Sequence, residues 1–198
     1  MYDYRRMSDA EKQEIVDLRI ERGYPWHKPP HPAQGEGWYF ITAATYEHRH
    51  HFAAPRELTA LTRRLMEAFA DANLPCAGWT VFPNHYHALA HAPNPQTIGR
   101  AIGPVHGRSS HYANRRDNAL RRQVWYKFSD RKVRSERHYW ACLHYIIWNP
   151  VKHGYVEQMC DWSWSCYHDL LQQHGSAWID DLMREYPLHD FGEKWDIM

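Results

Sequence analysis

The order of strand and helix signals in the first half of the chain most constrains its fold. A β-rich run over 38–42 precedes a helix that Pro55 opens, with apolar side chains recurring at helical spacing. Two further strand signals, at 78–82 and 85–90, are separated by the turn-forming pair Pro83-Asn84. Strand, helix, strand, strand is the order that begins a ferredoxin-like sheet. We therefore predict an α+β fold, with a ferredoxin-like antiparallel sheet and helices on one face of it.

The second half of the chain continues this pattern less regularly. Residues 95–120 have a helical pattern, but three glycines and a proline interrupt it, so we expect this helix to be short or kinked. A strand-like run follows over 124–133. Ser135 can cap a helix that runs to Trp148, because its hydroxyl can accept from the free amides of the first turn. Pro150 and Gly154 are expected to end this helix.

Proline content and charge divide the chain into three parts. Residues 1–36 combine a short polar helix candidate, 8–22, with an arm rich in proline and histidine. We expect the arm to be extended, because prolines at this density exclude helix and central strand. Residues 37–156 hold the expected sheet domain, and residues 157–198 are expected to form an acidic, helical C-terminal extension.

The composition is that of a globular protein from a reducing compartment. With 43% hydrophobic and 15% aromatic residues among 198, the chain can bury a core, which excludes disorder throughout. The four cysteines form no CxxC pair and are expected to be free thiols. No apolar run approaches the roughly 18 residues of a membrane span, and the first residues lack the apolar region of a signal peptide. We therefore expect a cytoplasmic protein with no membrane partner.

The distribution of charge favours a nucleic-acid partner, although the net charge is only +1. Between residues 100 and 137, eleven basic residues stand against three acids, a balance of +8, whereas from residue 157 nine acids stand against two basic residues, a balance of −7. A basic segment of this kind can neutralise phosphates. A solvated basic face with no partner is the alternative. The candidates for DNA contacts are Arg100, Arg108, Arg115, Arg116, Arg121, Arg122, Lys127, Arg131, Lys132 and Lys152.

A His-x-His pair gives the first candidate for chemistry. In a strand, side chains two residues apart lie on the same face, so His85 and His87 project together while Tyr86 points toward the helices. Two imidazoles so placed can hold one divalent cation. The chain has 16 histidines, so a chance pair with a structural role is the alternative.

The second candidate is Tyr145, on the helix that Ser135 caps. Helical spacing places Tyr145 on the less apolar side of this helix, free to face a cleft, with Asn149 one turn later. The side-chain oxygen of Asn149 is a hard ligand suited to magnesium or manganese. Aromatic packing is the alternative role for Tyr145, which is one of 13 tyrosines.

Together these two groups of residues indicate phosphoryl-transfer chemistry. A tyrosinate is a competent covalent nucleophile on phosphorus, and a metal held by two histidines and an amide can polarise a phosphate. A phosphotyrosine link would keep the energy of the broken phosphodiester bond, so the break could be rejoined.

The chain resembles the REP-associated tyrosine transposases, relatives of the HUH-class single-tyrosine transposases. The resemblance spans roughly residues 20 to 170, with the motifs in matching order. The runs that carry it are Arg22–Trp26, Val81–Leu89, Val124–Asp130, Tyr145–Val156 and Asp161–Ser165.

The resemblance implies cleavage of single-stranded DNA near imperfect hairpins, dependent on Mg²⁺ or Mn²⁺, through a 5′-phosphotyrosine intermediate. By position, it implies that Tyr145 is the nucleophile and that His85, His87 and Asn149 bind the metal. It allows a monomer or a homodimer. The sequence departs from the family's pattern at Tyr86, where a smaller aliphatic residue is usual, and in the glycine-rich stretch 99–107.

Two other functions remain open at this point. A non-catalytic binder of structured DNA or RNA would keep the fold and shift a hairpin without cutting it. A metal-dependent hydrolase of small phosphodiesters would use the histidines without a tyrosine adduct and would not need a hairpin.

Overall fold

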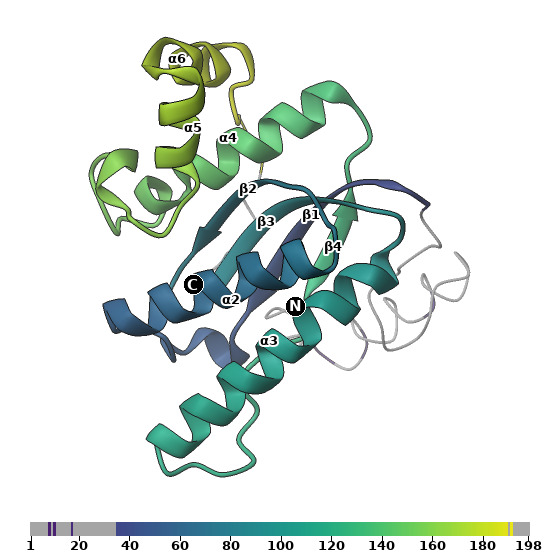
Figure 1. Cartoon of the computed structure of the whole chain (residues 1–198), viewed down its shortest axis with the longest axis vertical. Coiled ribbons are helices and arrows are strands. Elements are labelled where there is room, and N and C mark those ends of the chain that lie inside the picture. Colours follow the sequence, from purple (N-terminus) through teal and green to yellow (C-terminus); the bar gives the residue numbers. More distant parts are fainter. Residues whose placement is uncertain (1–7, 9, 11–16, 18–34, 190, 192–198) are drawn as a thin grey trace.

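The computed structural model describes residues 8, 10, 17, 35–189 and 191 (Figure 1). The N-terminal helix and the proline-rich arm predicted for residues 1–36 lie outside the described residues, apart from single positions. The elements are β1 (Gly37–Ala44), η2 (Tyr46–His48), α2 (Pro55–Asp71), β2 (Cys76–Val81), β3 (His85–Ala92), α3 (Pro95–Arg116), β4 (Ser129–Lys132), α4 (Glu136–Lys152), η3 (Met159–Asp161), α5 (Tyr167–His174) and α6 (Ser176–Glu185).

The four strands form one antiparallel sheet in the order β2-β3-β1-β4. Strands β1 and β3 pair along their whole length, from Gly37 opposite Ala92 to Ala44 opposite His85. With α2 between β1 and β2 and α3 between β3 and β4, the chain follows the β-α-β-β-α-β order of the ferredoxin-like fold. The predicted α+β ferredoxin-like fold is confirmed.

Helices α2 and α3 cover one face of the sheet, as predicted (Figure 1). Leu65 of α2 lies in the same buried core as Ile41 of β1. Neighbouring strand positions point to the opposite face, where Phe40 and Leu89 share a second core with Ile146 of α4. Helix α4 thus adds a third layer, which the prediction of helices on one face did not include.

Helix α3 is continuous over 22 residues, so the prediction of a short helix is wrong. Its start is capped by Asn94, whose side chain accepts a hydrogen bond from the backbone N–H of Thr97. Ile98 and Ile102 are fully buried on the face toward the sheet. Burial of this apolar face outweighs the low helix propensity of the glycines and the hydrogen bond lost at Pro104.

Helix α4 begins as predicted but ends later. Ser135 is its N-cap, and the Ser135 side chain accepts from the backbone N–H of His138. The helix was predicted to run to Trp148 and to be ended by Pro150 and Gly154, but it continues through Pro150 as far as Lys152. A proline removes only one N–H donor from the helix, whereas the left-handed backbone of Gly154, at φ 68°, ends it.

The predicted strand over 124–133 is paired only in part. Strand β4 pairs with β1 from Ser129 to Lys132, and Trp125 makes a single bridge to Thr45. The Trp125 ring instead stacks on His106 of α3, with ring centroids 4.5 Å apart. Two backbone hydrogen bonds, from the N–H of Tyr46 to the carbonyl of Val124 and from the N–H of Tyr126 to the carbonyl of Ala44, still join this part of the run to the end of β1.

The residues after 157 add η3, α5 and α6 beside α4 (Figure 1). Leu170 of α5 and Ile179 and Leu182 of α6 join the core on the α4 side of the sheet. Across the described ranges, every helix is too short or too polar to cross a membrane.

Candidate functional site: a histidine pair beside a buried tyrosine

The histidine pair opens β3, directly after the turn from β2. Across this turn the backbone N–H of Phe82 donates to the carbonyl of His85 at 2.8 Å. The rings of His85 and His87 lie 5.1 Å apart on the α4 side of the sheet. Tyr86 points to the other side, where its hydroxyl lies 2.9 Å from Nε2 of His106 on α3. The structure therefore places the pair and Tyr86 on opposite faces, as predicted.

Hydrogen bonds at Nδ1 orient both imidazoles. Nδ1 of His85 lies 2.8 Å from Oδ1 of Asn84, an atom that can only accept, so His85 donates from Nδ1. Nδ1 of His87 lies 2.9 Å from Oγ1 of Thr42, the residue opposite His87 in β1. The acceptor at Nδ1 of His85 leaves the lone pair of that ring on Nε2, and the Thr42 hydroxyl has the same effect at His87 when it accepts from Nδ1. Nε2 is therefore the atom of each ring that would ligate a cation.

Tyr145 lies on α4 against this pair. Its ring centroid is 5.4 Å from that of His87 and 5.8 Å from that of Phe40. Nζ of Lys152 donates to the Tyr145 hydroxyl at 2.9 Å. The prediction that Tyr145 faces an open cleft is wrong for this conformation, because the residue is fully buried and Phe191 packs on it with ring centroids 5.7 Å apart.

Asn149 lies one helical turn after Tyr145 and is also fully buried. Within the part of the chain that the structure describes, neither Oδ1 nor Nδ2 of its side chain has a hydrogen-bond partner. A buried amide without a partner is costly, so its presence points to a ligand that the protein does not supply. Two histidine nitrogens and the Asn149 oxygen fit a divalent cation. Without that amide oxygen, the described residues contain no group of three His, Cys, Asp or Glu side chains that could hold a metal.

The close approach of α4 to the sheet depends on a glycine in β2. A Cβ atom at Gly78 would lie 2.6 Å from Cδ1 of Leu143 and 3.4 Å from Cδ1 of Ile146. Leu143 and Ile146 both lie on the turns of α4 next to Tyr145. The absence of a side chain at Gly78 therefore lets α4 hold Tyr145 and Asn149 close to the sheet.

The thiol of Cys142, on the same helix, is unreactive. Cys142 lies one turn before Tyr145 and is fully buried. Burial raises the pKa of the Cys142 thiol to about 12, so it stays protonated at neutral pH. Tyr145, in contrast, contacts the histidine pair through the ring of His87.

The structure separates the predicted DNA-contacting residues into groups. Lys152 lies at the Tyr145 hydroxyl, and Arg131 and Lys132 lie on β4. Arg116 and Arg122 both pair with Asp117, and Arg116 also pairs with the buried Glu57 of α2. Arg121, Lys127 and Arg100 are exposed, on the loops after α3 and on α3 itself. Arg108 and Arg115 lie on α3, on the side of the sheet away from Tyr145.

Sequence reasoning missed several residues of the site. Thr42 was not predicted, and only the β1–β3 register reveals that it faces His87. His153 follows α4 and has its ring 5.0 Å from that of His85. Phe191 is far from Tyr145 in the sequence, so no local sequence pattern predicts that its ring packs on Tyr145.

This chain is similar to known proteins in both sequence and fold. No family model matches the chain. A REP-associated tyrosine transposase of Escherichia coli is 23% identical over 137 residues, which are 68% of this chain and 78% of that protein. A putative REP-associated tyrosine transposase of Haemophilus influenzae is 41% identical over 46 residues, 23% of this chain and 26% of that protein.

A solved structure of a REP-associated tyrosine transposase bound to a REP hairpin has a similar fold. The TM-score is 0.61 at 21% identity, over 75% of this chain and 87% of that one. At this identity the likeness shows the fold alone, and the sequence relatives carry the same family name independently. The resemblance seen in the motifs is confirmed: this chain is similar in sequence to REP-associated tyrosine transposases and similar in fold to one of them.

Proposed function

We propose that this protein nicks single-stranded DNA at hairpin-forming sequences and transfers the cut strand, through a 5′-phosphotyrosine intermediate on Tyr145. The observation that carries the proposal is the packing of Tyr145 against His87, with the unsatisfied amide of Asn149 on the next turn. A nucleophile, two imidazoles and an amide oxygen converge here from β3 and α4. These are the groups that a covalent phosphoryl transfer requires.

The cleavage step forms one bond and breaks one. The hydroxyl of Tyr145 releases its proton, Oη attacks the phosphorus of the scissile phosphodiester, and the bond from phosphorus to the 3′ oxygen breaks. The 3′ oxygen takes a proton and leaves as a hydroxyl, while the 5′ phosphate stays on the tyrosine. Attack of a 3′ hydroxyl on this phosphotyrosine reverses the step and joins two strands, so no external energy source is needed.

Lys152 is suited to assist Tyr145. Its ammonium donates to the phenolic oxygen at 2.9 Å, and Nζ lies 4.5 Å from the centre of the Tyr145 ring. A cation at this distance stabilises negative charge that develops on the oxygen before attack. The same contact holds the oxygen in one position. Access of DNA to Tyr145 requires Phe191 to move away from its ring.

The residues present fit a divalent cation. Nε2 of His85, Nε2 of His87 and Oδ1 of Asn149 would hold Mg²⁺ or Mn²⁺, which when bound supplies charge stabilisation at the scissile phosphate. The hydrogen bonds that Nδ1 of His85 makes with Oδ1 of Asn84 and Nδ1 of His87 makes with Oγ1 of Thr42 would keep the two rings oriented for this role.

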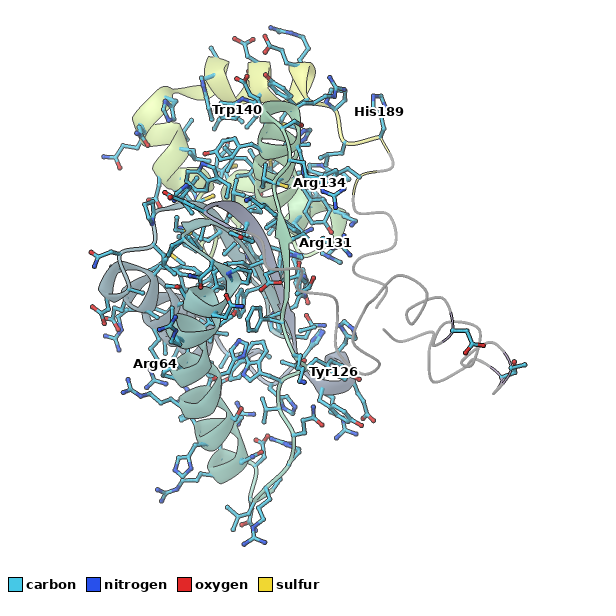
Figure 2. All side chains as sticks on the ribbon, turned by 90° about the vertical axis from the view of Figure 1, so that its right-hand side faces the viewer. Arg64, Tyr126, Arg131, Arg134, Trp140 and His189 are labelled. Atoms are coloured by element: carbon cyan, nitrogen blue, oxygen red, sulfur yellow. The ribbon has the colours of Figure 1, made fainter. Side chains whose placement is uncertain are left out.

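The proposed substrate follows from the relatives and from the basic residues on this side of the fold. The structural relative is bound to a REP hairpin. Arg131 and Arg134 lie near the start of α4 (Figure 2), where they could contact the phosphates of a strand that reaches Tyr145.

The test is formation of a covalent protein–DNA adduct. The full chain is incubated with a labelled single-stranded hairpin and Mn²⁺, and the products are separated on a denaturing polyacrylamide gel. Tyr145→Phe should abolish the adduct and the nick while retaining hairpin binding, because it removes only the nucleophilic oxygen. Tyr139→Phe, on the same helix with its ring 5.1 Å from that of Trp38, is the matched control and should react normally.

Two outcomes would contradict the proposal. An adduct at the normal rate with Tyr145→Phe would exclude this residue as the nucleophile. Binding of hairpins without any metal-dependent cut by the unaltered chain would indicate the non-catalytic binder instead.

A further inference from the structure

A wide groove lies between α2 and α3, on the face of the fold opposite to α4. Its volume is about 750 Å³. Arg64 of α2 forms one side, and the other lining residues all come from α3. In Figure 2 Arg64 lies well apart from Arg131 and Arg134, which are near the start of α4. The lining residues are Arg64, Gly107, Arg108, His111, Tyr112, Arg115 and Arg116.

The groove is strongly cationic. Four arginines and a histidine line it, and the lining contains no carboxylate. Arg116 pairs with Glu57 and Asp117, so its charge is largely balanced. The other three guanidinium groups, on two different helices, surround one hollow and attract an anion with several charges.

The groove also offers an aromatic surface. Tyr112 is 41% exposed. Among the described residues, Tyr112 and Leu120 are the two large hydrophobic side chains that are exposed. Its ring lines both this groove and a smaller adjoining hollow of about 160 Å³. The guanidinium of Arg116 lies over the ring, 6.0 Å from its centre. At Gly107 an added Cβ would meet open space, so a ligand can approach the helix backbone there.

We propose that this groove is a second nucleic-acid-binding site, which takes an unpaired nucleotide segment with a base stacked on Tyr112 and its phosphates at Arg64, Arg108 and Arg115. An exposed ring between arginines is the combination that binds single strands, because stacking uses the face of a base and guanidinium groups bind phosphate. A paired base keeps its faces inside the duplex stack, so Tyr112 could not use it.

This site is separate from the proposed cleavage site. Tyr145 lies on the other side of the sheet, packed with the core that contains α4. A strand in the groove would therefore be held away from the nucleophile, as an anchor for unpaired nucleotides of the same or another DNA molecule. The inference does not depend on cleavage, since binding in the groove needs neither Tyr145 nor a metal.

The test measures binding without cleavage. The full chain is titrated in EDTA into a fluorescent oligothymidylate of about 12 nucleotides, a length within the range of single-strand sites. Tyr112→Ala should raise the Kd about tenfold, whereas Tyr112→Phe keeps the stacking surface and should bind normally. Arg64→Ala should raise the Kd and lower the slope of log K against log salt by about 0.7, the contribution of one phosphate on a single strand.

The matched control is the neighbouring arginine on α2. The side chain of Arg63 is 69% exposed, lies outside the groove lining and pairs with Glu67. Arg63→Ala should change the Kd by less than about twofold, as expected for a distant surface charge. Photocrosslinking with 4-thiothymidine in the same oligonucleotide should label the peptide that contains Tyr112.

The proposal is overturned if Arg63→Ala and Arg64→Ala weaken binding equally, since this would indicate general surface charge. It is also overturned if Tyr112→Ala binds normally, or if duplex DNA competes as well as the single strand. Because EDTA removes the metal, these results are independent of whether Tyr145 cuts DNA.

Discussion

Replacing Asn149 by leucine distinguishes a metal ligand from a structural amide. Leucine has the same branching as asparagine, so the change removes the polar atoms and largely keeps the shape. In the described structure the amide is fully buried and makes no side-chain hydrogen bond. Burial of such a group costs about 1–3 kcal/mol in proteins. Asn149→Leu should therefore raise the free energy of unfolding by about 1–3 kcal/mol in EDTA.

The advantage of Asn149→Leu over the unaltered chain should shrink when metal is added. A ligand that binds only the folded state stabilises it by about 2.7 kcal/mol at a hundred times its Kd. Loss of one ligand of three should raise the Kd for Mn²⁺ at least about tenfold, which removes about 1.4 kcal/mol of this gain. The assay is urea denaturation of the unaltered chain and of Asn149→Leu, each in EDTA and in Mn²⁺.

Asn114→Leu is the matched control for this measurement. Asn114 is also buried, but its Nδ2 donates to the carbonyl of Arg122 at 2.9 Å and its Oδ1 accepts from Nε of Arg122 at 3.1 Å. Removing these bonds should destabilise the protein by about 1–3 kcal/mol, with and without Mn²⁺. The reasoning about Asn149 is refuted if Asn149→Leu destabilises the protein in EDTA and keeps the full stabilisation by Mn²⁺.

Three further predictions concern the fold. Gly78→Ala should lower the free energy of unfolding by about 1–3 kcal/mol, because the new Cβ would overlap Leu143 of α4. The measurement is urea denaturation, and an unchanged midpoint would show that α4 is not closely packed there. Burial lowers the pKa of His106 to about 4 from 6.5, so stability should fall as the pH falls from about 6.5 to 4, where the unfolded chain binds the extra proton. This fall should be smaller in His106→Gln, and an equal fall would exclude His106 as its cause. The hydrogen bond from Arg116 holds the pKa of Asp117 well below its usual range, so its stabilisation is present above the ordinary pKa and lost in stronger acid. Thermal melts of Asp117→Asn should be lower than those of the unaltered chain at pH 7 and converge with them in acid; parallel curves would contradict this.

The local features of the fold could be predicted from the sequence. The strand–helix–strand–strand order, the Pro55 start of α2 and the Ser135 cap of α4 depend on neighbouring residues and on short periodicities. The opposite faces of His87 and Tyr86 follow from strand alternation alone. Each of these signals is contained within a few residues of sequence.

The features that were missed depend on contacts between distant segments. Burial of an apolar face against the sheet keeps α3 continuous through its glycines and Pro104. The pairing of Arg116 with Glu57, which is 59 positions away in the sequence, was not predicted. Tyr145 was expected to face a cleft, and the ring of Phe191 covers it. No local pattern encodes such partners, because they are set by how the packed elements meet.

The central claim is that Tyr145 becomes covalently attached to DNA. It is tested most directly by digesting the reaction of the full chain with a single-stranded hairpin and Mn²⁺, then mapping the modified peptide by mass spectrometry. The proposed chemistry predicts a nucleotide joined through its 5′ phosphate to Tyr145, and a free 3′ hydroxyl on the released fragment. An adduct on another residue, or cut DNA with a 5′ phosphate and no adduct at any time, would contradict it.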